Sequence, residues 1–470
     1  MGMGAILTIL SAALMTAANY YGHLYFLNWF ALLPFFYYIY IYSPEINYRK
    51  IFLRGWNLGF WILFFSANFL YYSIKLYTAA ASITVILLLI LLFSILSLIY
   101  GLFFIFYFFL QQKLFADKSL SAFFFAGCWT LFELARHYLF FFFPIANPAY
   151  TQADFSSFVQ LAAVGGIWLS TFILIFVNGL FFQIIFQKKF KKIIILVLII
   201  ILIFGFANYR EQSRPVSSYN NKQKIEIGII TSEIEQQKKW SADQLQVNIE
   251  LTLKAASKLN QTGLIIAPET NLTFDFGSDK YYRQNFLDRV AAELKTPIQI
   301  GSLAAKNTGS GRYNSSYLIS ASGEIVSRYD KNLLLYFGET YPFKDLLNKY
   351  TPYYFSSLNA GHEKKIFKSQ DLKWETVICS EILYPEYVKV DRGEVDFIVN
   401  QTNEAWFQDS RLLKNIMWQA AVFRAVENGI PVIKTGNKSY NGIIYPSGSY
   451  QKVNSGTNYH ILNFEIPDSK

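Results

Sequence analysis

Seven apolar runs with almost no charge occupy the first 209 residues, and they constrain the fold of this 470-residue chain more than any other feature. They lie at residues 5–20, 24–42, 57–74, 79–110, 119–142, 160–187 and 193–208. Because a bilayer offers no water to unpaired backbone groups, apolar segments of this kind cross it as helices. We therefore expect a membrane domain over residues 1–209 with about seven transmembrane helices. The run at 79–110 would measure about 48 Å as one helix, so we expect it to tilt or protrude.

The charged residues divide the chain into two unlike halves. Residues 1–209 contain 11 Lys/Arg and 4 Asp/Glu. The remaining 261 residues contain 31 Lys/Arg and 28 Asp/Glu. Most of the net charge of +10 thus belongs to the apolar half. Since nucleic-acid binding needs a basic face on a folded domain, we expect no nucleic-acid partner. The sequence also shows no metal-ligand spacing, phosphate loop or dinucleotide fingerprint, so we expect no metal and no other cofactor.

Basic residues in the short connections predict the orientation, because such residues are retained on the cytoplasmic side. With the N-terminus inside, only Lys75 and Arg136 fall in outer connections. The nine inner ones are Arg49, Lys50, Arg54, Lys113, Lys118, Lys188, Lys189, Lys191 and Lys192. Seven spans then carry everything after about residue 210 out of the cytoplasm. The first run lacks the basic start of a secretory signal and leads into another apolar run, so we expect it to be retained.

The second half alternates short β-branched segments with amphipathic ones, which is typical of an α/β sandwich. Strands are predicted at 224–231, 263–268, 297–304, 313–320, 324–330, 375–379, 395–400, 431–435 and 442–446. Helices are predicted at 242–260, 282–295 and 410–429. We expect a linker at residues 210–223 and an extracytoplasmic α/β domain over residues 224–470.

Three residues that could act together end predicted strands: Glu269 in IIAPETN, Lys331 in SRYDKNLL and Cys379 in ETVICSEIL. Side chains at the carboxyl ends of strands face a common crevice, and other α/β enzymes present a nucleophile at a strand-to-helix turn. Each residue alone is more often structural, but the three in one fold suggest a cysteine-dependent site. The second cysteine, Cys128, lies in an apolar run, so we expect no disulfide between them.

Short motifs surround these residues. They are Lys331 followed by Phe337-Gly338-Glu339, then Cys379-Ser380-Glu381, then Asn403-Glu404-Ala405-Trp406-Phe407, and Trp240 in QQKKWSADQL. The order Glu269, Lys331, Cys379 along the chain resembles that of the nitrilase superfamily. The surrounding motifs resemble its membrane branch, the bacterial apolipoprotein N-acyltransferases. The likeness continues in the membrane half, at residues 55–74 and 133–152, so it covers nearly the whole chain.

The resemblance implies a nitrilase-like αββα sandwich and an acyltransferase with a ping-pong mechanism. Cys379 would take a fatty acyl chain from a membrane phospholipid as a thioester, and the α-amine of the diacylglyceryl-modified N-terminal cysteine of an apolipoprotein would then receive it. Glu269 would be the base, and Lys331 would stabilise the oxyanion. Glu339 and Glu381 would orient the lysine and balance its charge.

The resemblance further implies that Trp240, Asn403 and Trp406 bind substrate. It implies a monomer without cofactors in the bacterial inner membrane, with the catalytic domain on the periplasmic face. Two alternatives stay open on the residues alone: a membrane-tethered amidase or nitrilase of unknown substrate, and a catalytically silent membrane scaffold.

The sequence departs from the family's pattern at several places. Ser380 stands where the family commonly has Tyr, and Gln408 stands where Gly is usual. The chain ends in the polar segment YHILNFEIPDSK, where the family usually has an eighth span. These departures remove none of the three central residues, but we expect them to bear on substrate preference.

Overall fold

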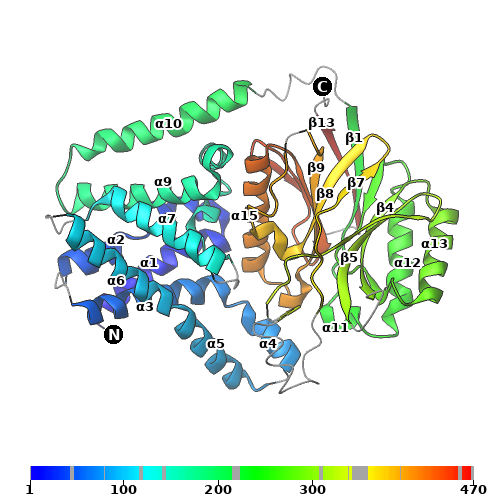
Figure 1. Ribbon diagram of the computed structural model, residues 1–470, viewed down its shortest axis with the longest axis horizontal. Coiled ribbons are helices and arrows are strands. Elements are labelled where there is room, and N and C mark those ends of the chain that lie inside the picture. Colours follow the sequence, from blue (N-terminus) through cyan, green and yellow to red (C-terminus); the bar gives the residue numbers. More distant parts are fainter. Residues whose placement is uncertain are drawn as a thin grey trace. The chain divides into compact units, whose positions relative to one another are not determined.

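The computed structural model describes residues 2–42, 47–78, 80–115, 120–139, 144–213, 223–305, 311–336, 338–340, 358–391, 393–453 and 458–466. It contains two compact units, one of Met1–Ser213 with Ser410–Phe423 and one of Arg214–Asp409 with Arg424–Lys470. The predicted order, an apolar helical part followed by an α/β part, is confirmed (Figure 1).

The first unit is built from helices. The longer ones are α1 (Met3–Tyr20), α3 (Tyr48–Ala67), α4 (Leu70–Thr78), α5 (Ser82–Leu96), α6 (Leu98–Leu114), α7 (Ala122–Leu139), α9 (Ala162–Ile185) and α10 (Lys192–Ser213). Shorter ones are η1 (Gly22–Trp29), α2 (Leu33–Tyr37), η2 (Tyr38–Tyr42), η3 (Pro148–Gln152) and α8 (Ser156–Val159). Asn47 caps the start of α3, because its side chain accepts a hydrogen bond from Lys50 N at 3.2 Å.

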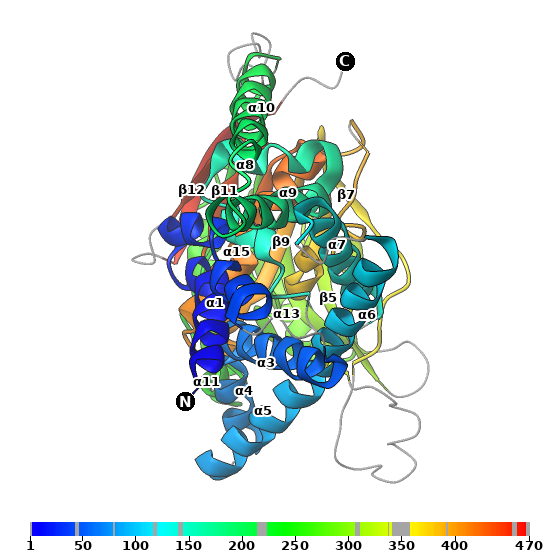
Figure 2. The same cartoon turned by 90° about the vertical axis from the view of Figure 1, so that its left-hand side faces the viewer.

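Helices α1, α3, α6, α7 and α9 gather into one bundle with a largely aromatic core (Figure 2). Two glycines let α3 and α6 approach closely: a Cβ on Gly55 would lie 2.5 Å from the Phe104 ring, and one on Gly59 would lie 2.5 Å from the Tyr100 ring. Small residues four apart allow such contacts between membrane helices. The glycine pair therefore explains how bulky rings fit between neighbouring helices.

Five helical segments among the described residues, some built from consecutive helices, are long and apolar enough to cross a membrane. They are Met3–Tyr20, Gly22–Tyr42, Ser82–Leu114, Ala162–Ile185 and Lys192–Gln212. Many of their apolar side chains are exposed, as on α10, where Ile194 is 64% and Leu202 is 67% accessible. An apolar surface of this extent is stable in lipid and not in water. The count of seven spans stays a prediction.

Several helix boundaries differ from the expected ones. The run at 79–110 is two helices, α5 and α6, with a turn at Ser97. Arg49, Lys50 and Arg54 were expected in a connection but lie within α3. Helix α10 continues to Ser213, into the first residues of the expected linker, and residues 214–222 lie outside the described part.

The second unit contains two β-sheets. One has the order β13-β1-β2-β4-β5-β6, with β3 also paired to β4, and the other has the order β12-β11-β10-β9-β8-β7. The strands are β1 (Gln223–Ile230), β2 (Leu264–Ile266), β3 (Leu272–Asp275), β4 (Ile298–Ala305), β5 (Arg312–Ile319), β6 (Ile325–Asp330), β7 (Ile366–Ser369), β8 (Leu372–Ile378), β9 (Phe397–Asn403), β10 (Val432–Asn437), β11 (Gly442–Ile444), β12 (Tyr450–Lys452) and β13 (Tyr459–Ile466).

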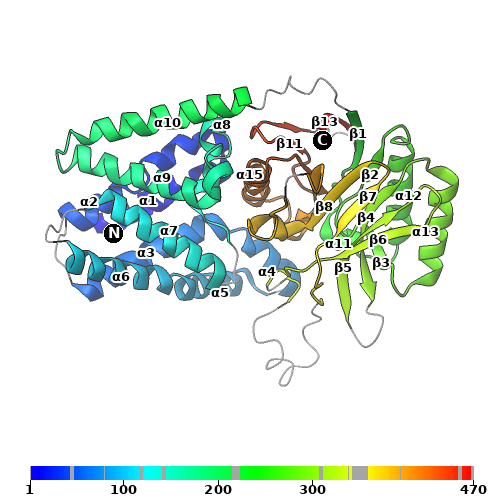
Figure 3. The same ribbon diagram turned by 45° about the horizontal axis from the view of Figure 1, so that its top comes forward.

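The two sheets pack face to face, and helices cover the outer face of the first sheet (Figure 3). Ile227 and Ile266 of the first sheet share one apolar core with Trp374 and Val399 of the second. Helices α12 (Gln244–Ser257) and α13 (Lys280–Glu293) form a further core with the first sheet. Helix α15 (Arg411–Asn428) connects β9 to β10, which pair in parallel and so need a crossover. The expected α/β sandwich is confirmed.

All nine expected strands are present, and four further strands were missed: β3, β7, β12 and β13. The clearest error concerns β13, which was expected to be a polar tail. It pairs antiparallel with β1 along all eight residues of both strands, and its Leu462 is fully buried. Next to the buried Leu462, the apolar Ile461 is 44% exposed, so the apolar residues here do not follow a simple alternation, and the pairing with β1 defines the strand.

Candidate active site

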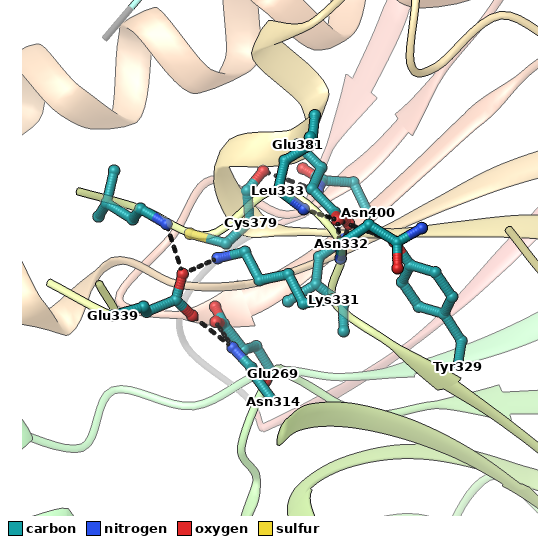
Figure 4. A network of polar contacts seen from close by, with 12 residues as sticks. Glu269, Asn314, Tyr329, Lys331, Asn332, Leu333, Glu339, Cys379, Glu381 and Asn400 are labelled. Carbon is teal, nitrogen blue, oxygen red and sulfur yellow. Dashed lines mark hydrogen bonds and ion pairs between the residues drawn. The ribbon is translucent and has the colours of Figure 1, made fainter. Parts of the chain in front are cut away.

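The three expected catalytic residues come from the ends of three strands of the second unit. Glu269 follows β2, Lys331 directly follows β6, and Cys379 directly follows β8 at the start of the short 3-10 helix η5 (Cys379–Leu383). Strands β2 and β6 lie in one sheet and β8 in the other. Figure 4 shows the three side chains turned toward one another. The facing sheets thus bring together residues that are far apart in the sequence.

Glu269 is a buried carboxylate, and only one of its two oxygens accepts a hydrogen bond within the described part of the chain. Its Oε1 accepts a hydrogen bond from Asn314 Nδ2 at 2.7 Å, whereas its Oε2 has no hydrogen-bond partner among the described residues. Burial raises the pKa of Glu269, and the Lys331 ammonium opposes that shift. A carboxylate with a raised pKa and a free oxygen is suited to taking a proton from a thiol.

Lys331 is a buried cation paired with Glu339. Its Nζ lies 2.6 Å from Glu339 Oε2. Burial alone would lower the pKa of Lys331, but the surrounding negative charges, Glu339 foremost, outweigh burial and hold that pKa above its ordinary value. Glu339 is itself held, since it accepts hydrogen bonds from Asn314 Nδ2 and Leu335 N, both at 2.8 Å. Lys331 is therefore a fixed positive charge that could stabilise an oxyanion.

Cys379 occupies a strained turn. Its φ angle is 51°, a left-handed conformation that costs a non-glycine residue about 1 to 3 kcal/mol. Burial, and after it the charge of Glu269, raises the pKa of the Cys379 thiol well above its ordinary value, while Lys331 opposes the shift. The thiol is therefore protonated at neutral pH, and it needs a neighbouring base to become a nucleophile.

Glu381 fixes the backbone on both sides of the site. Its carboxylate accepts hydrogen bonds from the backbone N–H groups of Asn332, Leu333 and Ile378 at 2.7, 3.0 and 2.7 Å. The first two follow Lys331, and the third precedes Cys379. Tyr329 Oη also donates to this carboxylate, at 2.8 Å. Burial raises the pKa of Glu381 to about 7, against the opposing charge of Lys331. Glu381 thus acts on the lysine and the cysteine through their backbone.

Two of the three residues expected to bind substrate, Trp240 and Asn403, lie next to a different residue, Lys239. Trp240 directly follows Lys239 at the end of the short helix α11 (Gln236–Lys239) and is 38% exposed. Asn403 is buried at the end of β9, and Trp406 lies in the 3-10 helix η6 (Glu404–Phe407). In the amide orientation that gives both donors an acceptor, Asn403 Oδ1 lies 3.3 Å from Lys239 Nζ and 3.2 Å from Trp406 Nε1.

Three residues of the site were not predicted from the sequence: Lys239, Asn314 and Tyr329. Asn314 links the two carboxylates of Glu269 and Glu339, and it lies in β5 at a position that is 3% exposed. A polar residue there becomes informative only once its burial is known. For Lys239 the signal was its place beside Trp240, but a lysine in a polar segment ordinarily points to solvent.

Two departures from the family's pattern have visible consequences. Gln408 has a φ of 55°, which explains why a glycine is favoured at that position. The hydroxyl of Ser380 is buried and has no hydrogen-bond partner among the described residues. Within the described ranges, no group of three or more His, Cys, Asp and Glu side chains is arranged to hold a metal ion.

Comparison with known proteins identifies the two parts of the chain separately. The family model described as carbon-nitrogen hydrolase matches residues 228–449, so the second unit is a domain of that superfamily. The model described as the apolipoprotein N-acyltransferase N-terminal domain matches residues 11–180. The chain belongs to the apolipoprotein N-acyltransferase family, and it is an integral membrane protein.

Curated relatives agree with this assignment. An apolipoprotein N-acyltransferase of Haemophilus influenzae is 28% identical over 350 residues, covering 70% of this chain and 66% of the relative. That of Aquifex aeolicus is 28% identical over 421 residues, covering 87% and 88%. The chain thus spans slightly less than two thirds of the Haemophilus protein. Among solved structures, an amidase from Nesterenkonia sp. is 15% identical, with a TM-score of 0.39 over 52% of this chain and 90% of the amidase.

Proposed function

We propose that this protein transfers a fatty acyl chain from a membrane phospholipid to the α-amine of the diacylglyceryl-modified N-terminal cysteine of apolipoproteins. The observation that carries the proposal is the convergence of the buried Glu269 and Lys331 with the half-buried Cys379, in a chain whose other unit consists of apolar helices. Both substrates are anchored in the membrane, so an enzyme with membrane helices meets both. An amidase for small polar substrates would not need such helices.

In the first half of the reaction, Glu269 Oε2 takes the thiol proton of Cys379 while Sγ attacks the ester carbonyl carbon of the phospholipid. The carbonyl oxygen becomes an oxyanion beside the Lys331 ammonium, where a donor of this kind contributes about 3 to 4 kcal/mol. The bond from the carbonyl carbon to the glycerol oxygen then breaks. The leaving oxygen takes the proton from Glu269, lysophospholipid departs, and a thioester remains on Cys379.

In the second half, the α-amine of the apolipoprotein attacks the thioester carbonyl, and Lys331 again stabilises the oxyanion. Glu269 takes a proton from the amine, the bond between carbon and sulfur breaks, and the Cys379 thiolate recovers the proton. The product is an amide. A thioester suits this step because an amine attacks it more readily than it attacks an oxygen ester.

We also propose that the protein is a monomer in the bacterial inner membrane, with the catalytic unit on the periplasmic face. The distribution of Lys and Arg supports this orientation, since nine of the eleven in the first 209 residues lie on the side taken as cytoplasmic. The strongest contributor is the cluster of Lys188, Lys189 and Lys191 in the connection between α9 and α10, with Lys192 at the start of α10.

The experiment that tests the proposed reaction uses the full-length protein in detergent with a phospholipid carrying a labelled acyl chain. We expect hydroxylamine-sensitive label on Cys379, release of lysophospholipid, and a mass increase at an apolipoprotein N-terminus. Cys379→Ala should abolish all three, whereas the matched variant Cys128→Ala should retain them, because Cys128 lies in α7 of the first unit. A wild-type protein that never acquires label contradicts the proposal, and cleavage of small amides instead would favour a membrane-tethered amidase.

A further inference from the structure

Lys239 is a buried lysine behind the proposed base, and the reaction described above leaves it without a role. It ends α11, and its side chain is 2% exposed. Its Nζ donates hydrogen bonds to Glu269 O at 3.2 Å and to Thr270 Oγ1 at 3.1 Å. In the swapped amide orientation of Asn403, its Oδ1 also lies 3.3 Å from Lys239 Nζ. An ammonium group has three protons, and two of those of Lys239 are held by the residues of one turn, Glu269 and Thr270.

The backbone turn that Lys239 contacts is strained and closely packed. Thr270 directly follows Glu269 and has a φ of 43°, a conformation that is unfavourable for a β-branched residue. On the other side the turn lies against β4, where a Cβ on Gly301 would come within 2.5 Å of Thr270 N. The turn sets the direction of the Glu269 side chain, so a group that stabilises the turn also determines where Oε2 points.

We propose that Lys239 is a positioning residue, whose ammonium holds the turn of Glu269 so that Oε2 faces Cys379. The proposal deepens the proposed function, because it rests on Glu269 acting as the base toward Cys379. It also connects the base with one residue expected to bind substrate, since Trp240 is the next residue in the chain.

The charges around Glu269 indicate how the role can be measured. Lys331 and Lys239 lower the pKa of Glu269, whereas burial and Glu339 raise it. Burial lowers the pKa of Lys239 itself to about 7, and the charge of Glu269 opposes that shift. Removing the Lys239 charge should therefore raise the pKa of Glu269, so that the base is ionised only at higher pH. As the pH is lowered, the reaction rate of Cys379 should therefore begin to fall at a higher pH in this variant than in the wild type.

The test compares Lys239→Met with Lys238→Met in the full-length protein, because Lys238 is the adjacent lysine and its side chain is 71% exposed. Alkylation of Cys379 by iodoacetamide is followed by mass spectrometry as a function of pH, next to phospholipid-dependent acylation. For Lys239→Met we expect alkylation at neutral pH to slow about tenfold, as misplaced catalytic groups do, with the acid limb of the profile moved to higher pH. Lys238→Met should behave as the wild type.

Equal rates and equal pH profiles for the two variants would overturn the proposal, as would a folded Lys239→Met with slower alkylation but an unmoved acid limb. If Lys239→Met does not fold, Thr270→Val removes one acceptor and keeps the side-chain shape: slower alkylation supports the proposal and an unchanged rate overturns it. Alkylation involves no lipid, so a failure of phospholipid transfer alone contradicts the proposed function and leaves this inference standing.

Discussion

At the scale of single residues, the site is a group of buried charges that balance one another. Asn314 Nδ2 donates to Glu269 Oε1 at 2.7 Å and to Glu339 Oε1 at 2.8 Å, so the two carboxylates lie side by side. Two neighbouring carboxylates ionise together only when a cation compensates them. Lys331 is that cation, since it lies 2.6 Å from Glu339 and lowers the pKa of Glu269.

Glu269 Oε2 has no hydrogen-bond partner among the described residues, which leads to a prediction about the Cys379 thiol. Glu269→Gln keeps an acceptor for Asn314 but removes the base, so Cys379, whose pKa is raised by burial, should no longer lose its proton near neutral pH. We expect iodoacetamide alkylation of Cys379 at neutral pH to slow by about 100-fold or more, with partial recovery in strongly alkaline solution. Mass spectrometry of the Cys379 peptide measures the rate. An unchanged rate at neutral pH would exclude Glu269 as the base.

The pairing of Lys331 with Glu339 leads to a prediction about stability. Lys331→Met and Glu339→Gln should each lower the free energy of unfolding by about 3 kcal/mol, because each leaves a buried charge without its partner. The double variant should lose clearly less than the two single losses combined. Thermal unfolding of the four proteins in one detergent completes this cycle. Additive losses would mean that the two side chains do not interact.

At the scale of elements, the sheets explain why the catalytic residues meet. Glu269 and Lys331 follow strands of the first sheet, and Cys379 follows a strand of the second. The position of each residue therefore depends on the core between the sheets, where Ile227, Ile229 and Leu462 are fully buried. Strand β13 contributes Leu462 to that core, and it forms the edge of the first sheet, paired with β1.

The alternation of side chains along β13 gives a matched pair of variants. Leu462 is fully buried, whereas its neighbour Ile461 is 44% exposed. We expect Leu462→Asp to destabilise the second unit by about 3 kcal/mol or more, because it buries a charge without a partner. Ile461→Asp should change stability by less than about 1 kcal/mol. Thermal unfolding distinguishes the two, and equal effects would contradict the pairing of β13 with β1.

For the protein as a whole, the number of transmembrane spans determines on which side of the membrane the second unit lies. Two counts are odd: five helical segments within the described part of the chain are long and apolar enough to cross a membrane, and seven apolar runs are expected from the sequence. An odd number of crossings places the two ends of the membrane part on opposite sides. Helices α3 and α7 account for the difference between the two counts. The proposed orientation is therefore the same whether both of them cross the membrane or neither does.

Reporter fusions test this orientation. An enzyme that is active only outside the cytoplasm should be active when fused after Ser213, at the end of α10, and inactive when fused after Phe190, in the connection that precedes α10. The physical reason is the retention of Lys188 and Lys189, which both fusions contain, on the cytoplasmic side. Activity of the second fusion and not of the first would invert the proposed topology.

Local pattern alone was sufficient to predict the apolar helices, nine of the thirteen strands found among the described residues, and the strand ends that carry Glu269, Lys331 and Cys379. Each of these depends on hydrophobic periodicity or composition over neighbouring residues, which the sequence displays directly. It also predicted Glu339 and Glu381 near the lysine, through the resemblance of their motifs, although their roles remain predictions.

Other features were decided only by the tertiary structure. Lys239, Asn314 and the unoccupied oxygen of Glu269 depend on contacts between segments far apart in the chain. The raised pKa of Cys379 depends on burial that no single segment creates. Strand β13 forms because β1 lies beside it, and not because of its own pattern. Sequence patterns record which neighbours a residue has along the chain, whereas pKa, strain and hydrogen-bond satisfaction depend on its neighbours in space.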